Sequence, residues 1–475
     1  MKLAKNKFKQ LNFFRMYPRR HFIKSALLTT IGFSSFYRCT SLSKDNPTSI
    51  IPLQLVPDPK GYLDLPEGFS YQIISKMGQP MSDGLQVPGR PDGMGTFLNA
   101  LGQTVIVCNH ENSPKPSENS PFGTDNNKIS TIDPKMIYDE GFQKTPGLGG
   151  TTTLVYDEDK EQLVESYLSL AGTYRNCAGG VTPWNSWLTC EEDVTKANQD
   201  TAEKDHGFVF EVPALNKGLA TPIPLKAMGR FNHEAVAVDL KTGIVYLTED
   251  RHDALFYRFI PNQVGKLMEG GKLQAMAIVD QKSWDTRNWE HPMVFKDKTY
   301  AIHWIDLDGV TAPEDDLRKR GFQKGAAKFA RSEGIWMGKN ELYFACTNGG
   351  PKQFGQVFKY RLSPFEGTNK EQQHPGTLKL FAESEEKSVM HMCDNLTLSP
   401  WGDVLLCEDN GELNHIKGIN QRGQLYTLAC NRSSQSELTG AVFSPTGKTL
   451  FVNIQENGDT LAIKGPWEQL RQKLL

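Results

Sequence analysis

The sequence predicts an all-β protein, a β-propeller of six blades with loop and helical insertions. Three observations support this prediction. Glycine is abundant, at 42 of 475 residues, and hydrophobic content is modest at 38%. Short apolar or alternating runs are separated by Gly, Pro, Asn and Asp, as in strands joined by tight turns. Long helical periodicity is nearly absent, and the best helical candidate is residues 313–331.

The N-terminus is typical of an export signal. Residues 1–40 carry nine Lys or Arg and no acid, and the apolar run that follows Arg20 is too short and interrupted for a spanning helix. Residues 18–24 resemble a twin-arginine signal, whose machinery exports folded proteins; an ordinary secretory signal is the alternative. We therefore expect a signal and linker over residues 1–45, one propeller domain over residues 46–475, and a periplasmic or extracellular location. Lipid attachment at Cys39 is not favoured.

The charge of the remaining chain limits its partners. Without the basic N-terminus, the formal charge changes from −2 to near −11. An acidic body argues against nucleic acid as a partner and suits cation binding. We expect a monomer with no stable membrane span.

Seven further cysteines follow Cys39, and none forms a CxxC pair, so a zinc ribbon is not expected. Because seven is an odd number, at least one thiol cannot form a disulfide within the mature chain. Most of these cysteines fit as small buried hydrophobic residues, and Cys177 is the exception, as its place in the repeat shows.

One module recurs along the chain: a strand, a tight turn with Pro, Asp or Gly, and a second strand. Four stretches align on their turns, at residues 177–192, 234–250, 333–347 and 394–409. A fifth, at residues 440–453, has the frame without the acids, and a sixth is expected between Asp92 and Glu111. Third strands are expected at residues 207–211, 255–258, 355–360 and 423–427. This pattern is typical of propeller blades, and a two-sheet sandwich is the competing fold.

The spacing of the modules is uneven. The 99 residues between Glu234 and Glu333 hold an insertion or a further blade. Residues 112–150 and 313–331 are expected to frame the entrance to the site.

The first residues of four modules carry metal-binding chemistry. Equivalent positions in successive blades lie at the same height around one axis. The four residues are Cys177, Glu234, Glu333 and Asp394. Such side chains would repel one another unless cations neutralise them. Carboxylate oxygens suit Ca²⁺ or Mg²⁺, whereas a thiolate suits iron, zinc or copper, so the mixture indicates more than one type of metal.

The end of the second strand also carries acids. Glu111 and Glu192 are the strongest candidates for ligands there. The first acids of the three pairs Glu191-Glu192, Glu249-Asp250 and Glu408-Asp409 fit equally well as solvated carboxylates at strand ends. His110 and His233 are interpreted as turn or core residues.

Arg331 precedes Glu333 by two residues and is the natural anion-binding group. If both lie on one strand they face the same way, which would place a guanidinium beside a metal-bound phosphate. The alternative is a salt bridge from Arg331 to a neighbouring acid.

Several of these motifs resemble the PhoX family of alkaline phosphatases in colinear order, from about residue 60 to 455. They are Asn176-Cys177-Ala178-Gly179-Gly180, Pro183-Trp184, and residues 188–192, 231–239, 246–250, 331–334, 394–402 and 406–409. The chain is shorter than the larger members of that family, so insertions that shape substrate choice are expected to be absent.

The resemblance implies a six-bladed propeller that hydrolyses phosphomonoesters with Fe³⁺ and Ca²⁺. Cys177 would be the iron thiolate ligand, while Arg331 and Asn395 would contact the phosphate. The residues that would bind iron or calcium are Glu111, Glu192, Glu234, Glu333 and Asp394. Metal-activated oxygen would replace a protein nucleophile, and iron loading before export would explain a pathway for folded proteins.

Three functions remain open from the sequence. The first is the exported phosphomonoesterase, which acts on small phosphate esters. The second is another propeller hydrolase, a calcium lactonase or a phytase-like enzyme; a lactonase would use one oxygen-liganded metal and no cysteine. The third is a metal-binding propeller without catalysis. A serine-nucleophile alkaline phosphatase is not expected, since we find no Asp-Ser-Ala-like turn.

Overall fold

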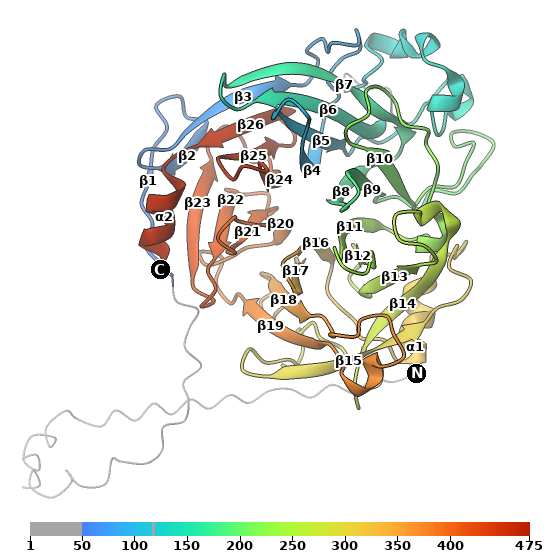
Figure 1. The fold of residues 1–475 in the computed structure, drawn as a ribbon, viewed down its shortest axis with the longest axis vertical. Helices are drawn as coiled ribbons and strands as arrows, with labels where there is room; N and C mark the ends of the chain where they lie inside the picture. The colour runs from blue at the N-terminus through green and yellow to red at the C-terminus, as the bar shows by residue number, and fades with distance from the viewer. Residues whose placement is uncertain (1–49, 116–118) are drawn as a thin grey trace, which may run out of the picture. The chain divides into compact units, whose positions relative to one another are not determined.

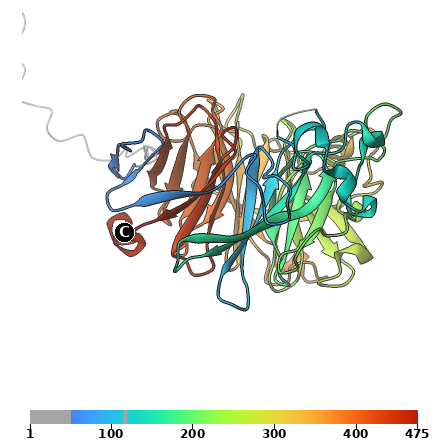
Figure 2. The ribbon, with the colours of Figure 1, turned by 90° about the horizontal axis from the view of Figure 1, so that it is seen from above.

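The computed structural model describes residues 50–115 and 119–475. Six blades of β-sheet in this part of the chain are arranged radially about one axis, as Figure 1 shows face-on and Figure 2 from the side. The all-β propeller is therefore confirmed, and the two-sheet sandwich was wrong. The predicted signal, with its arginine pair and Cys39, lies outside the described residues.

The first three blades run outward from the axis in sequence order. Blade 1 comprises β4 (Pro91–Leu98), β5 (Thr104–His110), β6 (Gly149–Asp157) and β7 (Gln162–Thr173). Blade 2 comprises β8 (Asn176–Val181), β9 (Ser186–Glu191) and β10 (Val209–Pro213). Blade 3 comprises β11 (His233–Val238), β12 (Val245–Glu249), β13 (Tyr257–Pro261), β14 (Gly271–Ile278) and β15 (Thr299–Asp306).

The last three blades borrow strands from other parts of the chain. Blade 4 comprises β16 (Ser332–Met337), β17 (Glu341–Cys346), β18 (Gln356–Arg361) and β19 (Thr377–Glu383), and β15 joins it to blade 3. Blade 5 comprises β20 (Cys393–Leu398), β21 (Val404–Glu408), β22 (His415–Ile419) and β23 (Leu425–Asn431), extended by β2 (Leu63–Pro66) and β1 (Leu55–Val56). Blade 6 comprises β24 (Leu438–Phe443), β25 (Thr449–Ile454), β26 (Asp459–Lys464) and β3 (Ser70–Lys76).

The six inner strands close a ring. β4, β8, β11, β16, β20 and β24 each contact the next in this order, and β24 contacts β4 again. Blade 6 takes its outer strand, β3, from the N-terminal part of the chain, so both ends of the propeller meet in one sheet. A closed ring of this kind leaves only short edges and fixes each inner strand at a defined distance from the axis.

Apolar layers between neighbouring blades hold the ring together. Each blade buries both of its faces, because alternate residues of one strand point to opposite sides. On β21, for example, Leu405 and Cys407 pack toward blade 6, whereas Val404 and Leu406 pack toward blade 4. One apolar cluster of this kind lies between every neighbouring pair of blades.

Glycines allow the inner strands to approach closely at the hub. A Cβ atom on Gly93 would lie 2.5 Å from the Ala178 Cα atom, and one on Gly334 would lie 2.4 Å from the Leu396 nitrogen. Only a space of about 20 Å³ remains between these strands. The axis is thus nearly filled there.

The helical parts differ from the sequence-based expectation. Within residues 313–331 only α1 (Leu317–Lys324) is an α-helix, and α2 (Trp467–Leu474) near the C-terminus was missed. Short 3₁₀ turns occur at η1 (Thr124–Asn126), η2 (Ile129–Thr131), η3 (Pro134–Met136), η4 (Gly141–Gln143), η5 (Lys226–Met228), η6 (Leu267–Glu269) and η7 (Glu371–Gln373). Across residues 50–115 and 119–475, no helix is long and apolar enough to cross a bilayer.

One open alternative is decided and two further expectations are corrected. The stretch after Glu234 holds β14, β15 and α1 as an insertion rather than a further blade. Residues 423–427 belong to the fourth strand of blade 5, because β22 takes the third place. Most of residues 112–150 lie on the outer edge of blade 1, where Phe122, Ile137 and Leu148 pack against it. The cysteines among the described residues are all buried and form no disulfide.

Candidate active site

The inner strands of all six blades carry a β-bulge at the end that faces the site. In blade 1, Pro91 pairs with His110 and Met94 pairs with Cys108, so one extra residue is accommodated beside Asp92. The other five inner strands show the same shift. A bulge redirects the side chain next to it. The side chains placed toward the axis in this way are Asp92, Cys177, Glu234, Glu333 and Asp394.

These side chains line one cavity of about 160 Å³ at the hub. The complete lining is Arg90, Asp92, Glu111, Arg175, Cys177, Glu192, Glu234, Asp250, Arg331, Glu333, Asp394, Asn395, Asp409 and Glu437. All eight site residues predicted from the sequence are among them. Their convergence is thus a structural fact, while the role of each one stays a prediction.

Two groups within the cavity have the geometry of metal sites. One ligand atom each from Cys177, Glu192 and Glu234 lie within 4.8 Å of one another. The same holds for Asp394, Asp409 and Glu437. The first group combines a sulfur with oxygens and the second offers oxygens alone, so the two groups suit metals of different softness.

The paired acids at the ends of the second strands divide between two environments. The second member of each pair, namely Glu192, Asp250 or Asp409, lines the cavity. The first member, Glu191, Glu249 or Glu408, is at most 1% exposed. Solvated carboxylates were one of two equal alternatives from the sequence at these three positions, and that alternative is wrong, because neighbouring residues along an extended chain point to opposite sides and these three point into the core.

The core-facing acids satisfy groups of their own blades. Glu191 accepts hydrogen bonds from the backbone nitrogens of Tyr174, Gly207 and Phe208, and it contacts His206. Glu249 accepts from the Tyr257 hydroxyl at 2.7 Å. Glu408 accepts from the backbone nitrogen of His391 and contacts His415. These contacts are structural and leave no oxygen directed into the cavity.

Three arginines face the carboxylates from equivalent positions. Arg90, Arg175 and Arg331 each lie two residues before an inner-strand ligand position, and each has a positive φ of 44–46°. Arg331 pairs with Asp250 at 2.8 Å and with Glu333 at 2.6 Å. The salt bridges proposed as the alternative role of Arg331 therefore exist. Arg331 does not lie within a strand as expected but directly before β16, where its backbone is left-handed.

The other two arginines share one carboxylate. Arg90 lies 2.6 Å from one oxygen of Glu111, and Arg175 lies 2.5 Å from the other. Arg175 also pairs with Glu192. The glutamate is thus held between two guanidinium groups from neighbouring blades.

Negative charge exceeds positive charge in the cavity. Nine carboxylates face three guanidinium groups. Burial, reinforced by neighbouring acids, raises the pKa values of Asp92, Glu234 and Glu437 well above normal. Burial also raises the pKa of Glu192 to about 8 and that of Asp394 to about 6. Bound cations would favour the ionised forms, so this donor set fits metal ions.

Cys177 lies inside this charged surrounding. Its side chain is 4% exposed, and its sulfur lies 3.3 Å from the backbone oxygens of His233 and Glu234. Burial, followed by the charges of Glu234 and Glu192, raises the pKa of the thiol well above its usual value. A metal ion at the sulfur would be needed to stabilise the thiolate.

Asn395 connects three blades below the carboxylates. Its Nδ2 donates to Asp394 at 3.1 Å and to Asp92 at 3.5 Å, and its Oδ1 accepts from the Gly440 nitrogen at 2.7 Å. In blade 6, Gly440 stands where the other inner strands carry an acid or cysteine, as expected from the fifth module, which lacks acids. The Asn395 side chain contacts the Gly440 backbone there.

Sequence reasoning missed several lining residues. Asp92 was identified as a module start and not as a ligand, although it aligns with the other four. Arg90 and Arg175 could have been found from the repeated arrangement of an arginine two residues before a ligand. Glu437 gave no such signal because it lies outside the aligned positions of its blade. The missed residues are Arg90, Asp92, Arg175, Asp250, Asp409 and Glu437.

The two histidines interpreted as core residues are confirmed as such. His110 is 2% exposed, and its nitrogens contact the Gly89 oxygen and the Thr152 hydroxyl. His233 contacts the Gly229 oxygen. Burial lowers the pKa of His110 to about 4 and that of His233 to about 3.

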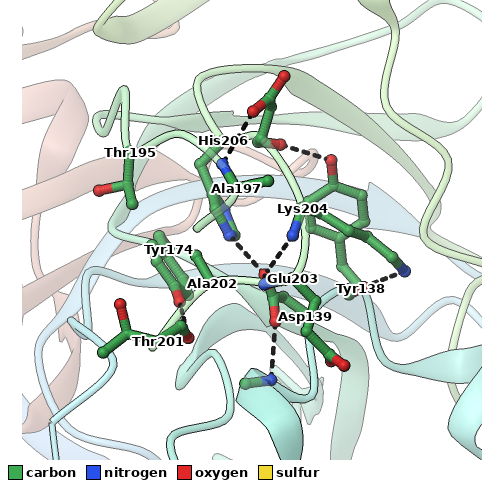
Figure 3. A network of polar contacts seen from close by, with 12 residues as sticks. Tyr138, Asp139, Tyr174, Thr195, Ala197, Thr201, Ala202, Glu203, Lys204 and His206 are labelled. Carbon is green, nitrogen blue, oxygen red and sulfur yellow. Dashed lines mark hydrogen bonds and ion pairs between the residues drawn. The ribbon is translucent and has the colours of Figure 1, made fainter. Parts of the chain in front are cut away.

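A buried polar network supports blade 2 beside the cavity. His206 lies 3.2 Å from Asp139, which also accepts from the backbone nitrogens of Glu203 and Lys204, as Figure 3 shows. The other nitrogen of His206 lies 2.6 Å from Glu191. Burial alone would lower the pKa of His206, but the two carboxylates outweigh it and raise the pKa to about 9. The network ties two loops to Glu191, the last residue of β9, directly before Glu192.

Fold and site together define a propeller with a carboxylate-rich hub, suited to bind cations and an oxyanion. The sequence matches the family described as alkaline phosphatase PhoX over residues 53–166 and 159–458. The chain therefore belongs to the PhoX alkaline phosphatase family and is a phosphoric monoester hydrolase. The resemblance seen in the motifs is confirmed.

One solved structure, with a TM-score above 0.5, shares the propeller fold. PhoX of Pseudomonas fluorescens, in complex with vanadate as a transition state analogue, has 18% identity, covers 88% of this chain and 98% of its own, and superposes with a TM-score of 0.62. The gluconolactonase XC5397 of Xanthomonas campestris has 12% identity, covers 87% and 98%, and reaches a TM-score of 0.39. No curated protein matches the chain in sequence.

Proposed function

We propose that this chain is an exported, metal-dependent phosphomonoesterase that releases inorganic phosphate from organic phosphate esters, with Fe³⁺ and Ca²⁺ held in the hub cavity. The observation that carries the proposal is the donor set of that cavity. One thiol and nine carboxylates surround three arginines in about 160 Å³. A lactonase with one oxygen-liganded metal would have no use for a cysteine among the donors.

The two metal types would occupy different groups of ligands. Cys177, Glu192 and Glu234 would hold iron, because a thiolate prefers a softer ion than calcium. Asp394, Asp409 and Glu437 would hold calcium through oxygens. Glu111 and Glu333 would complete the coordination. When bound, these ions would polarise the phosphoryl group and activate water as the nucleophile.

The chain's own residues would bind and orient the ester. Arg331 is 23% exposed and can present donors to a phosphate oxygen while Asp250 fixes its orientation. Asn395 would offer its amide from below. The described lining contains no serine, threonine or histidine, and its one thiol, Cys177, would be a ligand of iron, which supports water rather than a side chain as the attacking group.

Export would follow from the N-terminal segment. The twin-arginine pathway accepts folded proteins, and the ligands of the cavity come from all six blades, so they assemble only when the ring has closed. Metals acquired in the cytoplasm would then travel inside the folded protein. The destination would be the periplasm or the exterior of the cell.

Elemental analysis of the purified mature protein, together with p-nitrophenyl phosphate hydrolysis with and without calcium, tests the proposal. We expect iron and calcium in the protein and a rate that depends on calcium. Absence of iron together with absence of phosphatase activity would overturn it.

A further inference from the structure

We propose that Trp289, with His252 and Arg287, forms a stacking subsite for a planar aromatic leaving group, such as an aryl group or a nucleobase. The proposal rests on the phosphomonoesterase function above and concerns the part of the ester that departs from phosphorus. The three side chains lie outside the cavity lining but are connected to it through the backbone around Arg331.

The loops that hold Arg331 also hold this subsite. The Arg331 nitrogen donates to the Arg251 oxygen at 2.9 Å, and the Thr347 nitrogen donates to the Arg331 oxygen at 3.0 Å. The next residues on these two loops are His252 and Asn348. A leaving group that extends from a phosphate at Arg331 toward these two loops would contact these residues.

Trp289 is fixed by both loops. Its indole nitrogen donates to the Asn348 oxygen at 2.6 Å. The amide nitrogen of Asn348 contacts Nδ1 of His252 at 3.0 Å. The rings of His252 and Trp289 lie 6.1 Å apart at 63°. A preorganised aromatic surface of this kind can bind a ligand with little loss of side-chain entropy.

Arg287 completes the platform and carries no spare charge. Its guanidinium lies 4.0 Å from the centre of the Trp289 ring, and it donates to the His252 oxygen at 3.0 Å. Asp285 binds the same guanidinium through both oxygens. Because this charge is already paired, the platform favours a flat neutral group over a second phosphate.

The exposure of the three residues fits a ligand surface. His252 is exposed, and Trp289 and Arg287 are half-buried. The indole nitrogen of Trp289 already has its partner, and Arg287 covers one face of the ring, so the rest of the ring offers only apolar surface to a ligand. Stacking on such a surface tolerates many aromatic groups and excludes none by hydrogen bonding.

The test compares two classes of substrate in matched variants. kcat/KM is measured for adenosine 5′-monophosphate and p-nitrophenyl phosphate on one side, and for glycerol 2-phosphate on the other. The variants are Trp289→Leu, Trp289→Phe and His252→Ala, in the metal-loaded full chain. Trp184→Ala is the control, since Trp184 lies in the turn between β8 and β9, at the opposite end of these strands from Cys177 and Glu191.

We expect Trp289→Leu to lower the ratio of aromatic to aliphatic kcat/KM by about threefold to tenfold, the range of an aromatic contact. The loss should appear in KM, because stacking acts on the ground state and the transition state alike. Trp289→Phe should restore most of the ratio, His252→Ala should lower it less, and Trp184→Ala should not change it.

Two results would overturn the subsite. An unchanged ratio in Trp289→Leu would show that the leaving group does not contact Trp289. An equal loss of kcat for both substrate classes would assign Trp289 a structural role. Both results leave the phosphatase function intact, whereas a wild-type protein that hydrolyses none of the three esters would contradict the proposed function itself.

Discussion

The cavity-facing and core-facing side chains at the blade ends have the same chemistry and opposite surroundings. Glu192 and Glu191 are neighbours on one chain, yet Glu192 lines the hub cavity while Glu191 accepts three backbone hydrogen bonds. Cys177 and Cys190 differ in the same way, since Cys190 is buried in the apolar layer between blades 2 and 3 without lining the cavity.

The difference separates carboxylates that stabilise the fold from carboxylates that can bind cations. The core-facing acids accept hydrogen bonds from groups of their own blades, and Glu191 accepts three from backbone nitrogens, so they stabilise the blade. A cavity-facing acid is crowded by like charges and destabilises the fold unless a cation binds. Substitutions in the two sets should therefore separate stability from activity.

The largest effect is expected at Cys177. Cys177→Ser should remove iron and lower phosphatase activity by more than about 100-fold, because a hydroxyl is a poor substitute for a thiolate ligand. Iron content and p-nitrophenyl phosphate turnover measure this. Cys190→Ser is the matched control and should keep iron; a Cys177→Ser protein that retains both iron and activity would refute the assignment.

The adjacent glutamates test the comparison directly. Glu191→Gln should lower the free energy of unfolding by about 3 kcal/mol, because it removes one of the two buried negative charges that face His206. Glu192→Gln should reduce metal content and activity instead, and the metal-free protein should be no less stable than the wild type. Urea unfolding measures the stability of both variants, and elemental analysis measures their metal content. Equal changes of stability and of metal content in the two variants would contradict the comparison.

Arg331 tests whether a paired arginine still binds substrate. Arg331→Ala should weaken inhibition by inorganic phosphate by about tenfold with metal content intact, since one charge-assisted contact contributes about 1.5 kcal/mol or more. The measurement is the phosphate inhibition constant beside the iron and calcium content. Loss of metal in this variant would show that its salt bridges to Asp250 and Glu333 are its main role.

The smallest effect concerns pH. The pKa of His206 is raised to about 9 by its two carboxylate neighbours. The folded state then binds more protons than the unfolded state between about pH 6.5 and pH 9, so this contribution to stability is complete below pH 6.5 and is lost as the pH rises through 9. His206→Gln should flatten that part of the stability profile. A wild-type profile without this decline would contradict the ion pairs of His206.

Much of the fold could be predicted because the strand–turn–strand module repeats in the sequence. Residues at equivalent module positions, such as Cys177 and Glu333, could be placed around one axis from the repeat alone. Glu437 could not be placed in this way, since Gly440 takes the ligand position in its blade and only the closed ring brings Glu437 near Asp394. The sequence left the first acids of the pairs undecided, because a strand end alone does not show which side is buried.

The sequence by itself determined the propeller, the family and the eight residues that converge on the hub, because all of these depend on local repeats and motifs. Only the tertiary structure decided which of two adjacent acids faces the cavity, how the three arginines pair, and that Trp289 is hydrogen-bonded to the loop that also contacts the Arg331 backbone. These features depend on bulges, strand register and contacts between distant segments, which local patterns in the sequence do not reveal.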